Sequence, residues 1–187
     1  MPRGIIESIN KRITVPIAKR LKYSPYITPN LITWISFFLS GIVAPFLILK
    51  ELYPLAGFFV YLGALLDSLD GDLARERNQT STEGAILDAV LDRYIDLFLI
   101  ASLTYVSQCW VWGLLAMIGS SLVPYVRAKT EAVGKKSVST FGSRDVRNLI
   151  LFLGLILSLP CETLGVLAVI SNLSAIHRFY FALKKEV

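Results

Sequence analysis

Residues 53-YPLAGFFVYLGALLDSLDGDLARER-77 begin with an uninterrupted apolar run and end in a cluster of charges. The apolar run suits a membrane-spanning helix, yet Asp67, Asp70 and Asp72 follow it directly. A carboxylate within a bilayer is costly and is usually retained for a function. This stretch therefore predicts a membrane protein and also a polar site at the edge of the membrane.

The composition of the whole chain supports this fold class. The 187 residues are 54% hydrophobic, and the mean hydropathy is +0.58. Leu, Ile, Val and Phe gather in long runs, whereas the strands of a membrane barrel would alternate apolar and polar residues. Backbone groups in lipid must be satisfied within the segment, so each span should be a helix. We expect an all-α integral membrane protein with a single domain over residues 1–187.

Six apolar runs predict six transmembrane helices in a bundle over residues 30–184. They lie at residues 30–49, 53–74, 82–107, 110–132, 143–159 and 163–184. Several of them carry polar first or last turns, which lowers their hydropathy without preventing a span.

Residues 3–22 predict an amphipathic helix that lies in the plane of the lipid headgroups. Pro16 is expected to kink this helix or to begin its second half. A helix that docks on a partner protein is the alternative interpretation. The apolar residues at helical spacing are Ile5, Ile6, Ile9, Ile13, Ile17 and Leu21, and the cationic face comprises Arg3, Lys11, Arg12, Lys19, Arg20 and Lys22.

The distribution of positive charge predicts the orientation. With the N-terminus in the cytoplasm and six alternating spans, every Lys and Arg except Lys50 lies on or near the cytoplasmic side. We therefore expect both termini and the aspartates at the cytoplasmic face of the cell membrane. Cys109 and Cys161 both fall in outer connections, where a disulfide and two free thiols are equally compatible with the sequence.

Two further aspartates extend the polar site. Asp67 and Asp70 are three residues apart, and Asp88 and Asp92 are four apart, so each pair shares one helix face. The two helices are joined by a short polar segment and must be antiparallel neighbours. Thr80 and Glu83 fit a capping box at the start of the second helix. The four carboxylates should therefore converge.

Four close carboxylates need compensation by protonation or by cations. Oxygen ligands without nearby His or Cys favour hard divalent ions such as Mg²⁺, Mn²⁺ or Ca²⁺. Two such ions would neutralise the four charges and suit attack on a phosphate. By contrast, we expect Asp72 to face the cytoplasm without a role, and Asp96 to pair with Arg93 or a hydroxyl.

The residues around these aspartates complete a motif. Gly71, Ala74 and Gly84 are small enough for a ligand to approach the backbone, and the guanidinium of Arg75 can hold a phosphate. The full pattern is DxxDGxxAR, eight residues, then GxxxDxxxD, over residues 67–92. All eight fixed positions match, and the pattern resembles the signature of the CDP-alcohol phosphotransferase family.

The resemblance implies a fold and a chemistry. Members of this family move a substituted phosphate from a CDP-linked donor to an alcohol and release CMP, in phospholipid biosynthesis. It implies that Asp67, Asp70, Asp88 and Asp92 hold two Mg²⁺ or Mn²⁺ ions and that Asp92 is the catalytic base. Gly71, Ala74, Arg75 and Gly84 would bind the donor. It also implies six helices around a cytoplasm-facing cavity and a homodimer.

Basic residues at the same membrane level bear on the acceptor. Arg127, Lys129, Arg144 and Arg147 lie at the ends of the spans 110–132 and 143–159 and could hold a phosphate on the acceptor. YVRAK followed by a basic helix start resembles the phosphatidylinositol-phosphate and archaetidylinositol-phosphate synthase branch. The donor would then be CDP-diacylglycerol, CDP-archaeol or similar, with inositol 1-phosphate as the first acceptor and glycerol 3-phosphate as the second.

Two alternatives to this function stay open at this point. A CDP-inositol donor with inositol phosphate would yield a soluble di-inositol phosphate. An ion or proton transporter would also retain acids within the membrane, but the outer halves of the spans are largely apolar. We expect membrane lipids but no nucleic acid among the partners.

Overall fold

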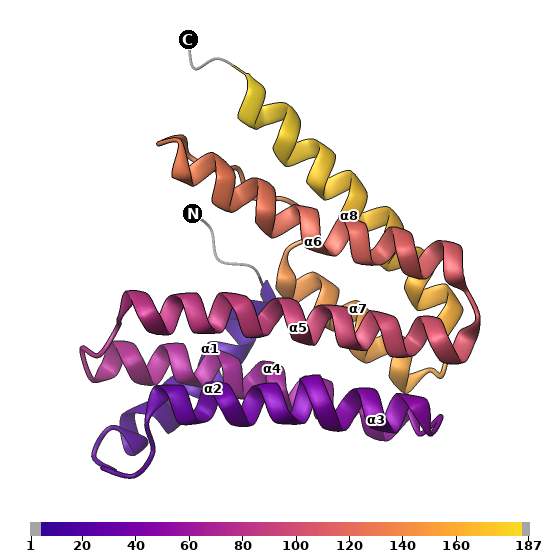
Figure 1. Ribbon diagram of the computed structural model, residues 1–187. Helices are drawn as coiled ribbons and strands as arrows, with labels where there is room; N and C mark the ends of the chain where they lie inside the picture. The colour runs from indigo at the N-terminus through magenta and orange to yellow at the C-terminus, as the bar shows by residue number, and fades with distance from the viewer. Residues whose placement is uncertain (1–4, 185–187) are drawn as a thin grey trace.

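The computed structural model describes residues 5–184, which form helices and their connections only (Figure 1). This confirms the predicted all-α class. The predicted boundaries agree with the helices closely, and α7 is the shortest of the predicted spans. The helices are α1 (Ile5–Leu21), α2 (Pro29–Phe37), a π-helical segment (Phe38–Val43), α3 (Ala44–Leu49), α4 (Tyr53–Glu76), α5 (Thr82–Ser107), α6 (Trp110–Ala132), α7 (Arg144–Ile156) and α8 (Pro160–Leu183).

Three continuous helical stretches are long and apolar enough to cross a membrane. They are Pro29–Leu49, Trp110–Ala132 and Pro160–Leu183. The helices α4 and α5 are as long, but each carries several charged residues. The helix α7 has only 13 residues. The fold is thus a helical bundle with three candidate spans, and six spans remain a prediction.

Local sequence signals account for the helix boundaries. Thr28 caps α2 by accepting a hydrogen bond from the Leu31 N–H at 3.2 Å, and Pro29 occupies the first turn. Gln108 ends α5 in the left-handed region, at φ 56°. The predicted capping box at Thr80 was wrong by one residue. Ser81 is the N-cap of α5, and its hydroxyl accepts from the Gly84 N–H at 3.0 Å.

The helix α4 approaches α2 and the π-helical segment closely at Gly63. A Cβ built on Gly63 would lie 1.7 Å from the Ser40 hydroxyl oxygen, so only glycine fits without a shift. The Ser36 hydroxyl donates to the Gly63 carbonyl at 2.9 Å. Small residues of this kind allow helices to pack tightly in membranes. This contact holds the first helical stretch against the helix that carries Asp67 and Asp70.

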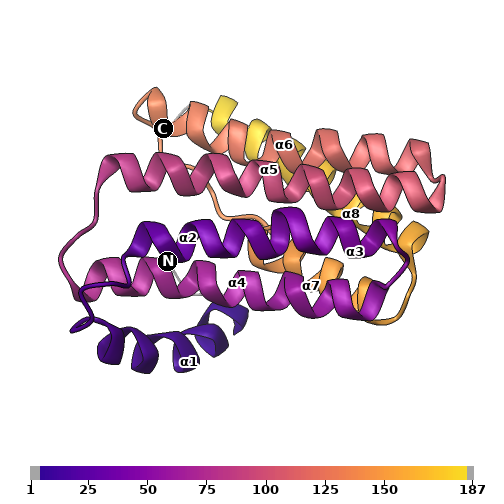
Figure 2. The ribbon, with the colours of Figure 1, turned by 60° about the horizontal axis from the view of Figure 1, so that its bottom comes forward.

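The helix α1 lies outside the bundle and against α4 (Figure 2). It buries Asn10, Thr14 and Ala18 towards the protein, whereas Ile13 and Ile17 are 44% and 40% exposed. The docked face therefore combines two polar side chains with an alanine, and the two isoleucines lie on the exposed side of the helix. Pro16 lies within one continuous helix, so it does not begin a separate one, and a kink at Pro16 stays a prediction. Arg3 and the side chains of Ile5, Ile6 and Ile9 lie outside the described residues.

Arg77 fixes the link between α1 and α2 from the end of α4. Its guanidinium donates to the carbonyls of Leu21, Ser24 and Ile27 at 2.6, 2.6 and 2.8 Å. Hydrogen bonds from a charged donor are among the stronger ones in proteins. The N-terminal helix is thus attached at the end of the bundle where α4 and α5 are joined.

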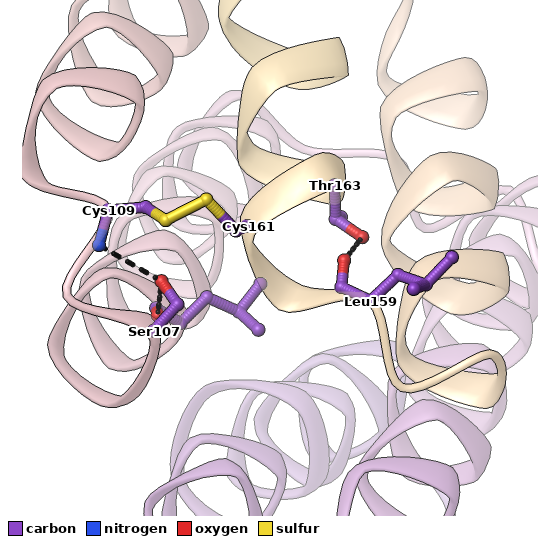
Figure 3. The surroundings of a disulfide bond; sticks show 6 residues. Ser107, Cys109, Leu159, Cys161 and Thr163 are labelled. Carbon is purple, nitrogen blue, oxygen red and sulfur yellow. Dashed lines mark hydrogen bonds between the residues drawn. A yellow bond between two sulfur atoms is a disulfide. The ribbon is translucent and has the colours of Figure 1, made fainter.

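A disulfide joins Cys109, in the α5–α6 link, to Cys161, in the first turn of α8, with the Cα atoms 5.7 Å apart (Figure 3). The α5–α6 link lies at the opposite end of the bundle from the α4–α5 link (Figure 1). Of the two alternatives that the sequence allowed, the structure has the disulfide. The disulfide links the start of α6 to the start of α8, two helices that pack side by side.

Candidate functional site

The α4–α5 hairpin brings three of the four predicted aspartates together. Asp67, Asp70 and Asp88 each offer a carboxylate oxygen, and these oxygens lie within 4.8 Å of one another. Asp70 is 7% exposed, and its Oδ2 accepts a hydrogen bond from the Thr33 hydroxyl of α2 at 2.5 Å. The first helical stretch therefore orients one member of the cluster.

Among the described residues, the protein does not supply a partner for every carboxylate oxygen of this cluster, as Asp88 shows. Its Oδ1 is buried and has no hydrogen-bond partner among the described residues. A buried acceptor without a partner is costly, and such an atom calls for an unseen ligand. Three carboxylates with oxygen ligands only fit a hard divalent cation. The residues present therefore fit the metal that the sequence predicts.

Asp92 lies one turn further along α5 and is joined to the cluster by Arg144. One guanidinium nitrogen of Arg144 lies 2.5 Å from Asp92 Oδ1, and the other donates to Asp67 Oδ2 at 2.5 Å. Asp92 is not part of the group of three. The structure thus places Arg144, predicted for the acceptor, directly between carboxylates of α4 and α5.

A second buried ion pair lies beside this one. Arg147 is 2% exposed, and its guanidinium donates to Asp96 Oδ2 at 2.9 Å and to the Gly142 carbonyl at 3.0 Å. Arg93 lies 3.5 Å from the same Asp96 oxygen. The predicted pairing of Asp96 with Arg93 is confirmed, and Arg147 is a second partner that the sequence did not reveal.

A cavity of about 170 Å³ lies on the α2 side of the cluster. The atoms nearest to a Cβ built on Gly71 belong to the Arg75 guanidinium, and the closest lies 3.5 Å away, which is ordinary contact. Packing within the protein therefore does not require glycine at this position. The structure brings all four residues predicted for the donor to this cavity, which is lined by Gly71, Ala74, Arg75, Gly84, Asp70 and Asp88 among others.

A larger cavity of about 830 Å³ lies on the other side, between α5, α6, α7 and α8. Asp88 lines both cavities, and Asp92 lines the larger one. Of the four basic residues predicted for the acceptor, Lys129 is exposed and does not line this cavity. The arginines that line it are Arg93, Arg127, Arg144, Arg147 and Arg178.

Arg178 is the residue that sequence reasoning missed. It projects from α8 into the larger cavity and donates to the Val123 carbonyl at 2.9 Å, while its Nε is buried without a hydrogen-bond partner. No ion pair to it is found among the described residues, whereas Arg127, Arg144 and Arg147 each have a carboxylate partner. The sequence did contain a signal for this residue, namely an arginine in an apolar helix at the level of the aspartates.

Fold and site together define a helical membrane protein with an acidic, metal-compatible cluster and two cavities that share Asp88. The CDP-alcohol phosphatidyltransferase family model matches residues 26–180, which include all six predicted spans except a few terminal residues. The chain belongs to this family, as the motif predicted.

Individual relatives agree with this assignment. The chain is 32% identical to the bifunctional IPC transferase and DIPP synthase of Thermococcus kodakarensis, over 95% of this chain and 44% of that protein. It therefore spans less than half the length of that relative. It is 30% identical to the archaetidylinositol phosphate synthase of Pyrococcus horikoshii, over 85% of each chain.

The fold also matches solved structures. The crystal structure of Mycobacterium tuberculosis phosphatidylinositol phosphate synthase with CDP-DAG bound matches with a TM-score of 0.81 and 26% identity, over 94% of this chain and 99% of that one. The same protein in complex with manganese and citrate matches with a TM-score of 0.81 and 25% identity, over 94% of each chain.

Proposed function

We propose that this protein transfers a substituted phosphate from a CDP-linked lipid to the hydroxyl of a phosphorylated polyol and releases CMP. The observation that carries the proposal is the position of Asp88, which lines two cavities on opposite sides of one carboxylate cluster. Two substrates can therefore approach the same carboxylates from different sides. Family membership and the relatives' names support the same reaction.

Asp67, Asp70, Asp88 and Asp92 would hold two divalent ions, Mg²⁺ or Mn²⁺. When bound, these ions supply positive charge to the donor pyrophosphate and to the leaving CMP. The protein's contribution is to fix the carboxylates on two packed helices, with the Thr33 hydroxyl orienting Asp70. The manganese complex of the M. tuberculosis protein supports the choice of metal.

Asp92 is suited to take the proton of the acceptor hydroxyl, because it lines the larger cavity and is 7% exposed. The hydroxyl oxygen forms a bond to the phosphorus that carries the lipid, and the bond from that phosphorus to the oxygen of CMP breaks. The proton moves to Asp92, and CMP leaves with the bond's electron pair. Arg144, between Asp67 and Asp92, keeps these two carboxylates oriented.

The smaller cavity would hold the cytidine and phosphates of the donor. Gly71→Ala should therefore weaken donor binding and raise the KM for the CDP-linked donor by about tenfold, since the added methyl group would take up space in the lining of this cavity beside the Arg75 guanidinium. The fold should be unharmed, because alanine in place of a helical glycine gains about 0.5–1 kcal/mol. Steady-state kinetics and thermal melting in detergent measure both effects.

Gly63→Ala is the matched control for this substitution. Its methyl group would collide with Ser40, so this variant should lose stability, by about 1–3 kcal/mol. A Gly71→Ala variant that melts early but binds the donor normally would show that Gly71 serves packing.

The larger cavity would hold the acceptor, with Arg178 as its phosphate ligand. Removal of one charge-assisted hydrogen bond costs about 1.5–3 kcal/mol. We expect Arg178→Ala to raise the KM for the acceptor by roughly ten- to a hundredfold and to leave the KM for the donor unchanged. Lys129 lies outside the cavity, so Lys129→Ala should change neither the acceptor KM nor the donor KM by more than about twofold.

A panel of acceptors measured by CMP release tests this assignment. Inositol 1-phosphate should be the best acceptor with CDP-diacylglycerol or CDP-archaeol, glycerol 3-phosphate the second, and free inositol poor. Equal rates with free and phosphorylated polyols, or an Arg178→Ala variant with unchanged acceptor KM, would contradict a phosphate-binding role.

A second candidate is the transfer from CDP-inositol to inositol phosphate. The 32% identity to the bifunctional protein of T. kodakarensis favours it. Including CDP-inositol among the donors distinguishes the two candidate reactions, because only transfer from CDP-inositol yields a water-soluble product besides CMP.

The placement in the membrane follows from the same proposal. We propose that α2 with α3, and α4 to α8, form six spans with both termini in the cytoplasm and the aspartates facing it. The exposed Ile13 and Ile17 of α1 support a position at the lipid surface. We also propose that the protein is a homodimer in the plasma membrane, with lipids around it.

A further inference from the structure

Asp72 is the residue at which the structure departs most from the sequence prediction. The expectation that its side chain faces the cytoplasm was wrong, because Asp72 is 4% exposed. Both of its carboxylate oxygens are used. Oδ2 accepts from the Thr14 hydroxyl at 2.5 Å, and Oδ1 accepts from the Arg75 guanidinium at 2.6 Å.

Thr14 brings the N-terminal helix into this contact. It is 2% exposed on the face of α1 that packs on α4, and its hydroxyl also lies 3.1 Å from the Asn10 carbonyl. Ala18, one turn further, packs with Leu69 and Leu73 of α4. The packing of Ala18 therefore holds this face of α1 against α4, and the Thr14 hydroxyl also contacts its own helix.

Arg75 is the third residue in this series of contacts, after Thr14 and Asp72. It lines the smaller cavity, yet its side chain is 57% exposed, and Asp72 is the carboxylate paired with it among the described residues. An exposed arginine samples many rotamers, and a fixed partner removes much of that freedom. Asp72 holds the guanidinium beside Gly71, in the part of the cavity where a donor phosphate would lie.

We propose that Thr14 and Asp72 are positioning residues that direct Arg75 into the donor cavity. Through them α1, which does not line that cavity, contributes to donor affinity. The inference rests on the proposed function, since it takes the smaller cavity as the donor site. It extends that function by giving the membrane-surface helix a part in substrate binding.

Thr14→Val tests the inference with the smallest change, because valine keeps the shape and loses the hydroxyl. The affinity for CDP, measured by titration calorimetry on the full chain in detergent with MgCl₂, should fall about three- to tenfold. The KM for the CDP-linked donor should rise by the same factor, with kcat and the acceptor KM within about twofold. Thr14→Ser should restore the wild-type values, and Asp72→Asn should lower CDP affinity at least as much as Thr14→Val.

A double-mutant cycle separates positioning from a general structural effect. In an Arg75→Ala background, Thr14→Val should cause no further loss of CDP affinity, because the group it positions is gone. An equal loss in both backgrounds, or a Thr14→Ser variant as weak as Thr14→Val, would overturn the inference. Wild-type protein that fails to bind CDP with MgCl₂ would overturn the proposed function itself, and the positioning role with it.

Discussion

Asp67→Asn and Asp88→Asn should each lower CMP release by at least about a thousandfold, which corresponds to about 4 kcal/mol of lost transition-state stabilisation. The amide removes a negative charge and one oxygen ligand from a cluster whose oxygens lie within 4.8 Å. Initial rates at saturating Mg²⁺ measure the effect. Because Asp88→Asn also relieves repulsion between neighbouring carboxylates and breaks no ion pair found among the described residues, the melting temperature of this variant should not fall.

Glu162→Gln is the matched control for these variants. It removes one negative charge from an exposed position next to the disulfide, at the other end of the bundle. Its rate should stay within about twofold of the wild-type rate. Substantial activity in Asp67→Asn or Asp88→Asn would contradict the role of these carboxylates as metal ligands.

Arg147→Met should cause the largest loss of stability. The substitution removes the closer partner of Asp96, which is 3% exposed, and leaves only Arg93 at 3.5 Å. Breaking a buried ion pair on one side costs about 3–5 kcal/mol. For a chain of this length we expect the melting temperature in detergent to fall by roughly 10 °C.

Two further variants define the cause of that loss. Arg127→Ala breaks an ion pair whose side chains are 61% and 49% exposed, and should change the melting temperature by about 1 °C or less. Replacing both Arg147 and Asp96 by apolar residues should recover much of the lost stability. If Arg147→Met melted at the wild-type temperature, the buried pair would not be a stabilising feature of this bundle.

The aspartate cluster could be predicted from the sequence because its geometry is local. Helical spacing places Asp67 with Asp70, and Asp88 with Asp92, and a short link forces the two helices to be antiparallel neighbours. The helix boundaries follow from apolar runs and capping residues in the same way. Even the one-residue error at Thr80 has a local cause, since Ser81 is an equally good N-cap.

The contacts between distant helices could not be predicted in this way. Arg144 was predicted to bind the acceptor phosphate together with other basic residues, and the structure places it between Asp67 and Asp92. The partners of Asp72 and the exposure of Lys129 depend on how α1 and α6 are rotated about their axes, which hydropathy does not determine. Arg178 is 86 residues from Asp92 in sequence (178 − 92), and only the packing of α8 brings it to the same cavity.

The central claim is that α4 and α5 hold paired divalent ions between the donor and acceptor cavities. Anomalous diffraction from crystals grown with Mn²⁺ tests it most directly. The account predicts two manganese peaks about 3.5–4 Å apart, bound by carboxylate oxygens of Asp67, Asp70, Asp88 and Asp92. Manganese bound elsewhere in the protein, with none between α4 and α5, would contradict it.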